Sequence, residues 1–326
     1  MKALRCTAFG PVNTLSVQQI PTPALMPEQV LVEVKAAALN FPDALVVQGK
    51  YQNKPSLPFS PGFELSGVIT DLGPEVNTWN VGDRVMATVD CGAFAEFCAV
   101  DGHRLVALPS NVDFREGAAT ILTYGTALYA LKDRAKIQPG ETILILGAAG
   151  GVGTAATHIA KLLGARVIAA ASTDERTALC LNAGADDVIN YTTDDLKTRA
   201  KQLTDNRGVD VVVDCVGGAQ SEAALRALGW HGRFLVLGFA AGEIPRIPLN
   251  LALLNEREIL GVFWGETVDR DPARHRENMT LLQHWMASKQ ITPAISQVVS
   301  LAEASTAIEQ LATRQATGKI VVNLAS

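Results

Sequence analysis

The sequence has few cysteines and little surplus charge, and these shortages exclude several classes of protein. Its five cysteines stand at positions 6, 91, 98, 180 and 215, with no Cys-x-x-Cys pair. Such a scattered, odd-numbered set indicates free thiols in a reducing cytoplasm rather than a disulfide framework. The 28 basic and 33 acidic side chains leave a net charge of −5. No basic run can neutralise a phosphate backbone, so nucleic acid is not an expected partner.

Long hydrophobic runs are also missing. No apolar stretch reaches the roughly 20 residues that cross a bilayer. The first ten residues, MKALRCTAFG, have no apolar core of a signal peptide. Hydrophobic residues nevertheless make up 48% of the 326 positions, which is enough for large buried cores. We therefore expect a soluble, cytoplasmic, two-domain protein with no membrane partner.

Two patterns alternate along the chain. Residues 1 to about 120 contain short β-like runs broken by Gly, Pro and Asp, which is typical of a small β-barrel or sandwich. From about 123, apolar strand-like runs alternate with helix-like segments, and this predicts a doubly wound α/β fold. The six runs lie at 142–148, 166–170, 186–190, 209–216, 232–239 and 258–264. Two further helices, at 273–288 and 302–314, precede a strand at 318–325 that we expect to return to the first domain.

A glycine-rich turn, GAAGGVGTAA at 147–156, follows one predicted strand and opens a predicted helix. It matches the second and third glycines of the GxGxxG fingerprint, which let the backbone approach a pyrophosphate and let helix and strand pack closely. A glycine turn that merely packs is the alternative, but the β-α-β context favours dinucleotide binding. The expected contacts are Ala149, Gly150, Gly151, Val152 and Gly153.

The end of the second strand favours NADPH over NADH. An NAD site usually carries an Asp or Glu there, bonded to the ribose 2′-hydroxyl. This strand ends AAASTDER, with Ala171 at that position and Ser172, Thr173 and Arg176 after it. Hydroxyl and guanidinium groups suit a 2′-phosphate. The two intervening acidic residues oppose this interpretation unless they point to solvent, and Arg176 has the alternative of being an ordinary exposed helix residue.

Together these motifs resemble the medium-chain dehydrogenase/reductase superfamily, in its zinc-independent quinone oxidoreductase branch. The resemblance covers nearly the full length and rests on LNFPDALVVQGKYQNKPSLPFSPGFELSGVI at 39–69, AAGGVG at 148–153, GADDVINY at 184–191 and GVDVVVDCVGG at 208–218. It implies a doubly wound Rossmann domain plus a GroES-like β-barrel catalytic domain. The expected bounds are 1–122 with 265–326 for the catalytic domain and 123–264 for the NADPH-binding domain.

The chain departs from the zinc-dependent alcohol dehydrogenases that this superfamily also contains. Those enzymes hold a catalytic zinc with a Cys in the early loop and a His in a Gly-His-Glu triplet. Here the loop offers Asn40 and Asp43, and the triplet reads Gly62-Phe63-Glu64. The four-cysteine structural lobe is absent too, and the five histidines are dispersed. Because zinc needs three or four ligands at fixed spacing, we expect no metal site.

Three residues of the early loop are the candidate catalytic groups. Asn40 can hold the nicotinamide ribose or a substrate carbonyl, since its amide both donates and accepts. Tyr51 can donate a hydrogen bond or a proton to oxygen that gains negative charge. A turn-capping Asn and a half-buried core Tyr are the alternatives. Asp43 either orients Tyr51 or caps a helix.

Further cofactor contacts follow from the resemblance alone. It places Thr126 along the nicotinamide and Tyr191 beside the 2′-phosphate, although Thr126 is equally a helix-start hydroxyl. It adds Gly238, Phe239, Phe263, Trp264 and Lys319. Lys319 has the alternative of a strand-edge surface residue. For the acceptor pocket, we expect about half of five aromatic residues to face the cleft: Phe41, Tyr51, Phe59, Phe63 and Trp264.

The resemblance implies a reductase that passes hydride from NADPH to a quinone or related conjugated carbonyl acceptor. An alternative is a 2-enoyl-thioester or alkenal reductase in which Tyr51 protonates the carbon skeleton. A third hypothesis is an NADPH-binding protein without turnover. The apolar run EILGVFW at 258–264 is a predicted sheet edge that needs covering, so we also expect a homodimer.

Overall fold

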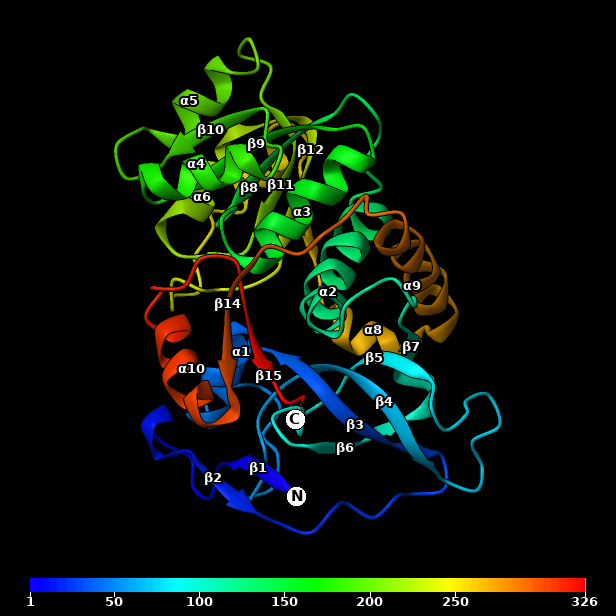
Figure 1. Ribbon diagram of the computed structural model, residues 1–326. Helices are drawn as coiled ribbons and strands as arrows, with labels where there is room; N and C mark the ends of the chain where they lie inside the picture. Colours follow the sequence, from blue (N-terminus) through cyan, green and yellow to red (C-terminus); the bar gives the residue numbers. More distant parts are fainter. Residues whose placement is uncertain (326) are drawn as a thin grey trace. The chain divides into compact units, whose positions relative to one another are not determined.

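The computed structural model describes residues 1–325, which form two compact units (Figure 1). The first contains Met1–Leu122 and the chain from Pro272 onward, and the second contains Thr123–Asp271. The second unit extends to Asp271 and so includes helix α8 (Trp264–Arg270), whereas the boundary expected from the sequence was residue 264.

The second unit is built on a six-stranded parallel sheet with the strand order β10-β9-β8-β11-β12-β13. Its strands are β8 (Thr142–Leu146), β9 (Arg166–Ala171), β10 (Asp187–Asn190), β11 (Val209–Asp214), β12 (Leu228–Val236) and β13 (Glu258–Gly261). All six predicted strands are therefore present, in the doubly wound order 3-2-1-4-5-6. In such a sheet ligands bind beyond the carboxyl ends of the strands, where the strand order reverses. Here that point lies between β8 and β11.

Helices connect these strands and cover the sheet (Figure 1). They are α3 (Gly151–Leu162), α4 (Asp174–Asn182), α5 (Leu196–Gln202), α6 (Ala219–Ala227) and α7 (Asn250–Leu253). Every residue of β8, which reads TILIL, is buried. A central parallel strand covered on both faces needs such a continuous apolar run, and this is why the sequence pattern was easy to recognise.

In the first unit, a sheet with the order β14-β15-β3-β4-β5-β7 is joined by β6, which pairs with β3. Its strands are β3 (Gln29–Ala38), β4 (Glu64–Leu72), β5 (Arg84–Thr88), β6 (Phe97–Asp101), β7 (Leu105–Ala107), β14 (Ile295–Ser300) and β15 (Lys319–Asn323). A separate antiparallel pair consists of β1 (Lys2–Arg5) and β2 (Ser16–Gln19). Because β15 pairs with β3, the predicted return of the last strand to the first domain is confirmed.

The remaining helices are α1 (Phe41–Val47), α2 (Phe114–Leu128), α9 (Pro272–Ala287) and α10 (Ala304–Ala312). Short 3-10 turns lie at Val12–Thr14 (η1), Gly102–Arg104 (η2) and Leu301–Glu303 (η4), and a π-helical stretch (η3) follows α2 at Tyr129–Arg134. Helices α9 and α10 correspond to the two predicted C-terminal helices. Strand β14 was not expected from the sequence, because its residues are mostly exposed and do not form an apolar run.

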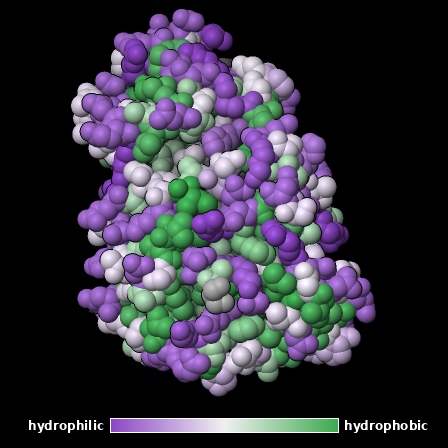
Figure 2. Space-filling model, viewed as in Figure 1, coloured by the Kyte–Doolittle hydropathy of each residue, from purple (hydrophilic) through white to green (hydrophobic). Residues whose placement is uncertain are grey.

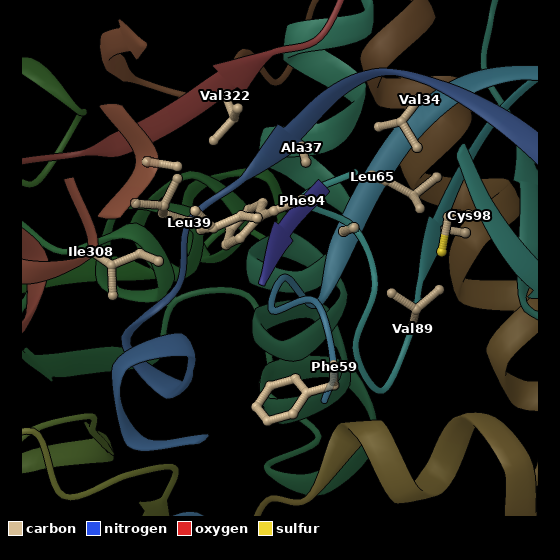
Figure 3. Packing of buried hydrophobic residues seen from close by; sticks show 14 of the residues in the cluster. Val34, Ala37, Leu39, Phe59, Leu65, Val89, Phe94, Cys98, Ile308 and Val322 are labelled. Atoms are coloured by element: carbon tan, nitrogen blue, oxygen red, sulfur yellow. The ribbon is translucent and has the colours of Figure 1, made fainter. Parts of the chain in front are cut away.

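The core of the first unit joins strands to the C-terminal helix (Figure 3). Val34 on β3 and Leu65 on β4 are almost fully buried, together with Ile308 from α10 and Val322 from β15. Ile308 and Val322 come from the C-terminal part of the chain, so this core combines residues from both ends of the sequence. Burying each such side chain contributes about 1.5–3 kcal/mol.

The visible face of the molecule is mostly hydrophilic, with smaller apolar areas between the polar side chains (Figure 2). Among residues 1–325, no helix is both long and apolar enough to cross a membrane.

Candidate functional site

The glycine turn after β8 is held by its own backbone. Gly150 N–H donates to the Gly147 carbonyl, and Thr154 N–H donates to the Gly150 carbonyl. A Cβ on Gly153 would lie 2.4 Å from the Gly147 oxygen, so this glycine is required for packing inside the turn. A Cβ on Gly150 would meet only that same oxygen, at 3.3 Å. The turn is therefore less crowded at Gly150, with one tight contact, than at Gly153.

Helix α3 begins at this turn without a side-chain cap. Within residues 1–325, no protein acceptor meets the backbone N–H groups of Gly151, Val152 and Gly153. The first N–H groups of a helix have no intrahelical partner, and the helix dipole adds partial positive charge there. This end of α3 thus has the donors that bind an anionic group such as a pyrophosphate.

The ends of β9 and β10 bring the predicted adenosine-side residues together. The two strands are neighbours, with Ala171 opposite Asn190, so Ser172 and Tyr191 follow at the same sheet edge. Thr173 caps α4 by accepting a hydrogen bond from the N–H of Arg176 at 3.3 Å. Ala171 is buried and offers no carboxylate where an NAD site has one.

The acidic residues that follow are engaged with local groups. Asp174 Oδ1 accepts a hydrogen bond from Asn190 Nδ2 at 2.8 Å. Glu175 is fully exposed in the first turn of α4, where its own backbone N–H and the Thr173 hydroxyl lower the pKa of its carboxyl. These carboxylates are thus partnered by the helix start and the neighbouring strand.

Two residues predicted beside the nicotinamide lie at the ends of β12 and β13. Phe239 and Phe263 are exposed, at 37% and 55% of their surface. Trp264, by contrast, is buried against α2, because a Cβ on Gly125 would come within 2.5 Å of its ring. The half-buried Thr126 follows that glycine on α2.

A tyrosine–histidine pair, which the sequence analysis did not foresee, ties α2 to α3. The Tyr124 hydroxyl lies 2.7 Å from His158 Nδ1. Burial lowers the pKa of the His158 imidazole and raises the pKa of the Tyr124 phenol, which favours the neutral form of both side chains. This contact joins the second half of α3 to α2.

In the first unit, two of the predicted residues, Asn40 and Lys319, meet in one buried polar network with Glu64. Lys319 Nζ donates to Asn40 Oδ1 at 2.8 Å, to the Leu39 carbonyl at 2.8 Å and to Glu64 Oε1 at 2.7 Å. Asn40 Nδ2 also donates to Glu64 Oε1, at 2.7 Å. The side chain of Lys319 is only 5% exposed and that of Glu64 is 0% exposed. Sequence reasoning missed Glu64, whose only signal was a carboxylate at the start of a buried strand.

Asp43 caps α1 and holds the loop before β4. Its Oδ2 accepts from the N–H of Asn40 at 2.7 Å and its Oδ1 accepts from the N–H of Gly62 at 3.1 Å. Asn40 and Asp43 form a capping box. Burial raises the pKa of Asp43 to about 7, against the opposing effects of these N–H groups and Lys319. The structure therefore supports the helix-capping alternative, and it places no Asp43 hydrogen bond on Tyr51.

Tyr51 packs edge-on against Phe63, with ring centroids 5.6 Å apart. Both side chains are half-buried. Within residues 1–325 no partner accepts from or donates to the Tyr51 hydroxyl, which leaves it available to a ligand. Burial, and then the charges of Asp43 and Asp90, raise the pKa of this phenol. Of the other aromatic candidates, Phe41 is half-buried, whereas Phe59 belongs to the core.

The residues at the triplet do not fit a catalytic zinc. Phe63 places a ring against Tyr51, and Glu64 is already paired with Lys319. In the described chain, residues 1–325, no group of three or more His, Cys, Asp and Glu side chains is placed to bind a metal ion. Burial also raises the pKa of Cys98 to about 12, which disfavours the thiolate that zinc requires.

Comparisons with known proteins identify the family. Residues 26–110 match the alcohol dehydrogenase GroES-like domain, and residues 151–283 match the zinc-binding dehydrogenase family. Rat quinone oxidoreductase-like protein 2 is 38% identical over 324 residues, which are 99% of this chain and 92% of that protein.

Two solved structures extend this likeness to the fold. Escherichia coli quinone oxidoreductase, solved in complex with NADPH, is 28% identical with a TM-score of 0.92, covering 99% of this chain and 100% of that one. The CurK enoyl reductase is also 28% identical with a TM-score of 0.89, covering 99% and 98%. The chain belongs to the medium-chain dehydrogenase/reductase superfamily, in its quinone oxidoreductase branch.

Proposed function

We propose that this protein is an NADPH-dependent, zinc-independent reductase whose acceptor is a quinone or a related conjugated carbonyl compound. The observation that carries the proposal is the start of α3, where the N–H groups of Gly151, Val152 and Gly153 meet no protein acceptor within residues 1–325. The residue after β9, Ser172, and the first turn of α4, with Arg176, add polar groups without a competing carboxylate at Ala171. NADPH, which is bound in the E. coli relative, fits this donor set.

When bound, NADPH supplies a hydride from its nicotinamide ring. The residues of this chain bind the cofactor and orient its nicotinamide ring. The turn at 149–153 holds the pyrophosphate, and Tyr191 with Ser172, Thr173 and Arg176 holds the 2′-phosphate. Thr126, Gly238 and the exposed Phe239 and Phe263 belong to the nicotinamide side in this proposal.

In the first unit, the Tyr51–Phe63 pair offers a flat, largely apolar contact for the acceptor, and the Tyr51 hydroxyl offers a hydrogen bond to its oxygen. The raised pKa of Tyr51 keeps the phenol protonated as a hydrogen-bond donor. The same shift makes it a weaker acid, which favours a quinone, whose reduced oxygens take protons readily, over an acceptor that needs a proton delivered to carbon.

The alternative is reduction of a 2-enoyl thioester or an alkenal, with Tyr51 as the proton donor. Its support is the hydroxyl of Tyr51, which has no partner within residues 1–325, and the likeness to an enoyl reductase. A protein that binds NADPH without turnover is the third reading.

One experiment separates these functions. NADPH oxidation by the pure, chelator-treated protein is followed at 340 nm with phenanthrenequinone and with crotonyl-CoA in parallel. We expect rapid turnover of the quinone and none of the thioester. Turnover of crotonyl-CoA alone would reassign the protein as an ene reductase, and NADPH binding without turnover of either would make it non-catalytic. Loss of activity on chelation would contradict zinc independence.

We further propose a homodimer that works in the cytoplasm. Strand β13 is the last strand of its sheet, and in residues 1–325 nothing pairs with its outer edge. Ile259 on that strand is exposed, and so are Ile244, Leu249 and Leu253 from the preceding segment. A second copy that pairs edge to edge would cover this apolar surface. All five cysteines are free, as a reducing compartment requires.

A further inference from the structure

The ammonium group of Lys319 is fully occupied inside the first unit. An ammonium has three N–H donors. Those of Lys319 go to the Leu39 carbonyl, Asn40 Oδ1 and Glu64 Oε1, all within 2.8 Å. No donor is left for a phosphate or a ribose, so the expected direct contact between Lys319 and the cofactor does not suit this arrangement.

The same network determines how Asn40 is oriented. The Lys319 ammonium can only donate, so the amide oxygen must face it, and the Glu64 carboxylate can only accept, so Nδ2 must face Glu64. The second Nδ2 hydrogen is directed to the Ala38 carbonyl at 3.2 Å. Both amide donors are therefore used within the protein, and Asn40 has none to offer a substrate carbonyl.

Two bonds connect this network to the aromatic pair. Asn40 is the N-cap of α1 and binds Glu64 through its side chain, while Asp43 in the first turn of α1 binds the N–H of Gly62. Phe63 lies between those two anchored residues. On the other side, α1 is followed by a turn at Gly49 (φ +67), and Tyr51 lies two residues beyond that glycine. Both rings of the pair are thus attached to elements that the network joins.

We propose that Lys319 is a positioning residue whose buried ammonium fixes Asn40 and Glu64 and, through them, aligns the Tyr51–Phe63 pair that receives the acceptor. This inference rests on the proposed function for the role of the pair, but the alignment itself does not depend on turnover. Glu64 contributes from the other side, because its Oε2 accepts from the N–H of Leu122 at 2.9 Å and so the carboxylate cannot rotate away.

The alignment is tested by ¹⁹F NMR on protein labelled with 3-fluorotyrosine. The chain has four tyrosines, and Tyr51→Phe identifies the resonance of Tyr51. We expect Lys319→Met to shift or broaden this resonance and to leave the other three in place. Lys289→Met is the matched control, since Lys289 forms an exposed ion pair with Glu116 in the same unit. If the Tyr51 resonance of Lys319→Met coincides with that of the wild type, the proposal is wrong.

Kinetics distinguish positioning from cofactor binding. For Lys319→Met we expect the Kd for NADPH to stay within about twofold and the kcat/KM for the quinone to fall about tenfold or more. In a Phe63→Leu background the same change should add less than about threefold, because the two residues act through one element. A tenfold weaker Kd for NADPH with an unmoved Tyr51 resonance would instead make Lys319 a cofactor ligand.

Two safeguards keep the test decisive. If Lys319→Met does not fold, Lys319→Met/Glu64→Gln removes both buried charges and is carried through the same measurements, with the same expected displacement of Tyr51. If the wild type oxidises NADPH with neither acceptor, the proposed function fails, and the NMR comparison alone decides whether Lys319 aligns the pair.

Discussion

The two glycines of the dinucleotide turn should fail in different ways when each is replaced by alanine. At Gly150, the φ of −83° is open to any residue, and the new methyl would meet only the Gly147 oxygen at 3.3 Å. We expect Gly150→Ala to change the free energy of unfolding by less than about 1 kcal/mol. If a pyrophosphate lies over this residue, the methyl displaces it from the N–H groups of α3. Losing one such charge-assisted hydrogen bond costs about 1.5–3 kcal/mol, or roughly a 10- to 100-fold weaker Kd for NADPH.

At Gly153 the same methyl would meet the backbone of the turn. It would lie 2.4 Å from the Gly147 oxygen and 2.6 Å from the Ala148 Cα, and neither atom can move without distorting the turn. Overpacking typically costs about 1–3 kcal/mol, and backbone on both sides places Gly153→Ala at or above the upper end of that range. Its defect should therefore appear first as a lower free energy of unfolding.

Both variants are measured by urea unfolding followed by circular dichroism and by NADPH titration followed by fluorescence. Gly265→Ala is the control, because a Cβ there meets nothing within 4 Å. A Gly150→Ala protein that binds NADPH as tightly as the wild type would refute the placement of the pyrophosphate. A Gly153→Ala protein of unchanged stability would refute the packing argument.

Three further outcomes are expected. Tyr51→Phe should lower quinone turnover by less than about tenfold, because the hydroxyl serves there only as a hydrogen-bond donor; a loss of about 100-fold or more would instead identify Tyr51 as a proton donor. The pKa of Asp43, raised by burial from 3.8 to about 7, means that the folded state holds an extra proton between those values. The free energy of unfolding of the wild type should therefore fall relative to that of Asp43→Asn as the pH rises from about 4 to about 7, with no further change above pH 7. A difference in melting temperature between the two proteins that stays constant across this range would contradict the shift. Ile259→Arg on the β13 edge should give monomers by light scattering, whereas Val298→Arg on β14, a sheet edge in the other unit, should leave the mass unchanged.

The sequence by itself determined the second unit almost completely. Its central strands β8, β9 and β11 are buried almost throughout, so each appears as a continuous apolar run, and the glycine turn lies entirely within one short segment. The first unit was harder to predict because its sheet draws strands from both ends of the chain. Strand β14, with mostly exposed residues, has no run by which it could be recognised.

Only the tertiary structure decided what the candidate residues do. Lys319 and Glu64 are 255 positions apart, and no local pattern could indicate that a lysine in TGKIVV turns inward to meet a buried carboxylate. The N–H donors of both Lys319 and the Asn40 amide are occupied within this network, while the Asp43 carboxylate caps a helix. Local sequence establishes which elements form, because hydrophobic periodicity and glycine conformation act over a few residues. The availability of a polar side chain depends on its partners, and folding brings these together from distant parts of the chain.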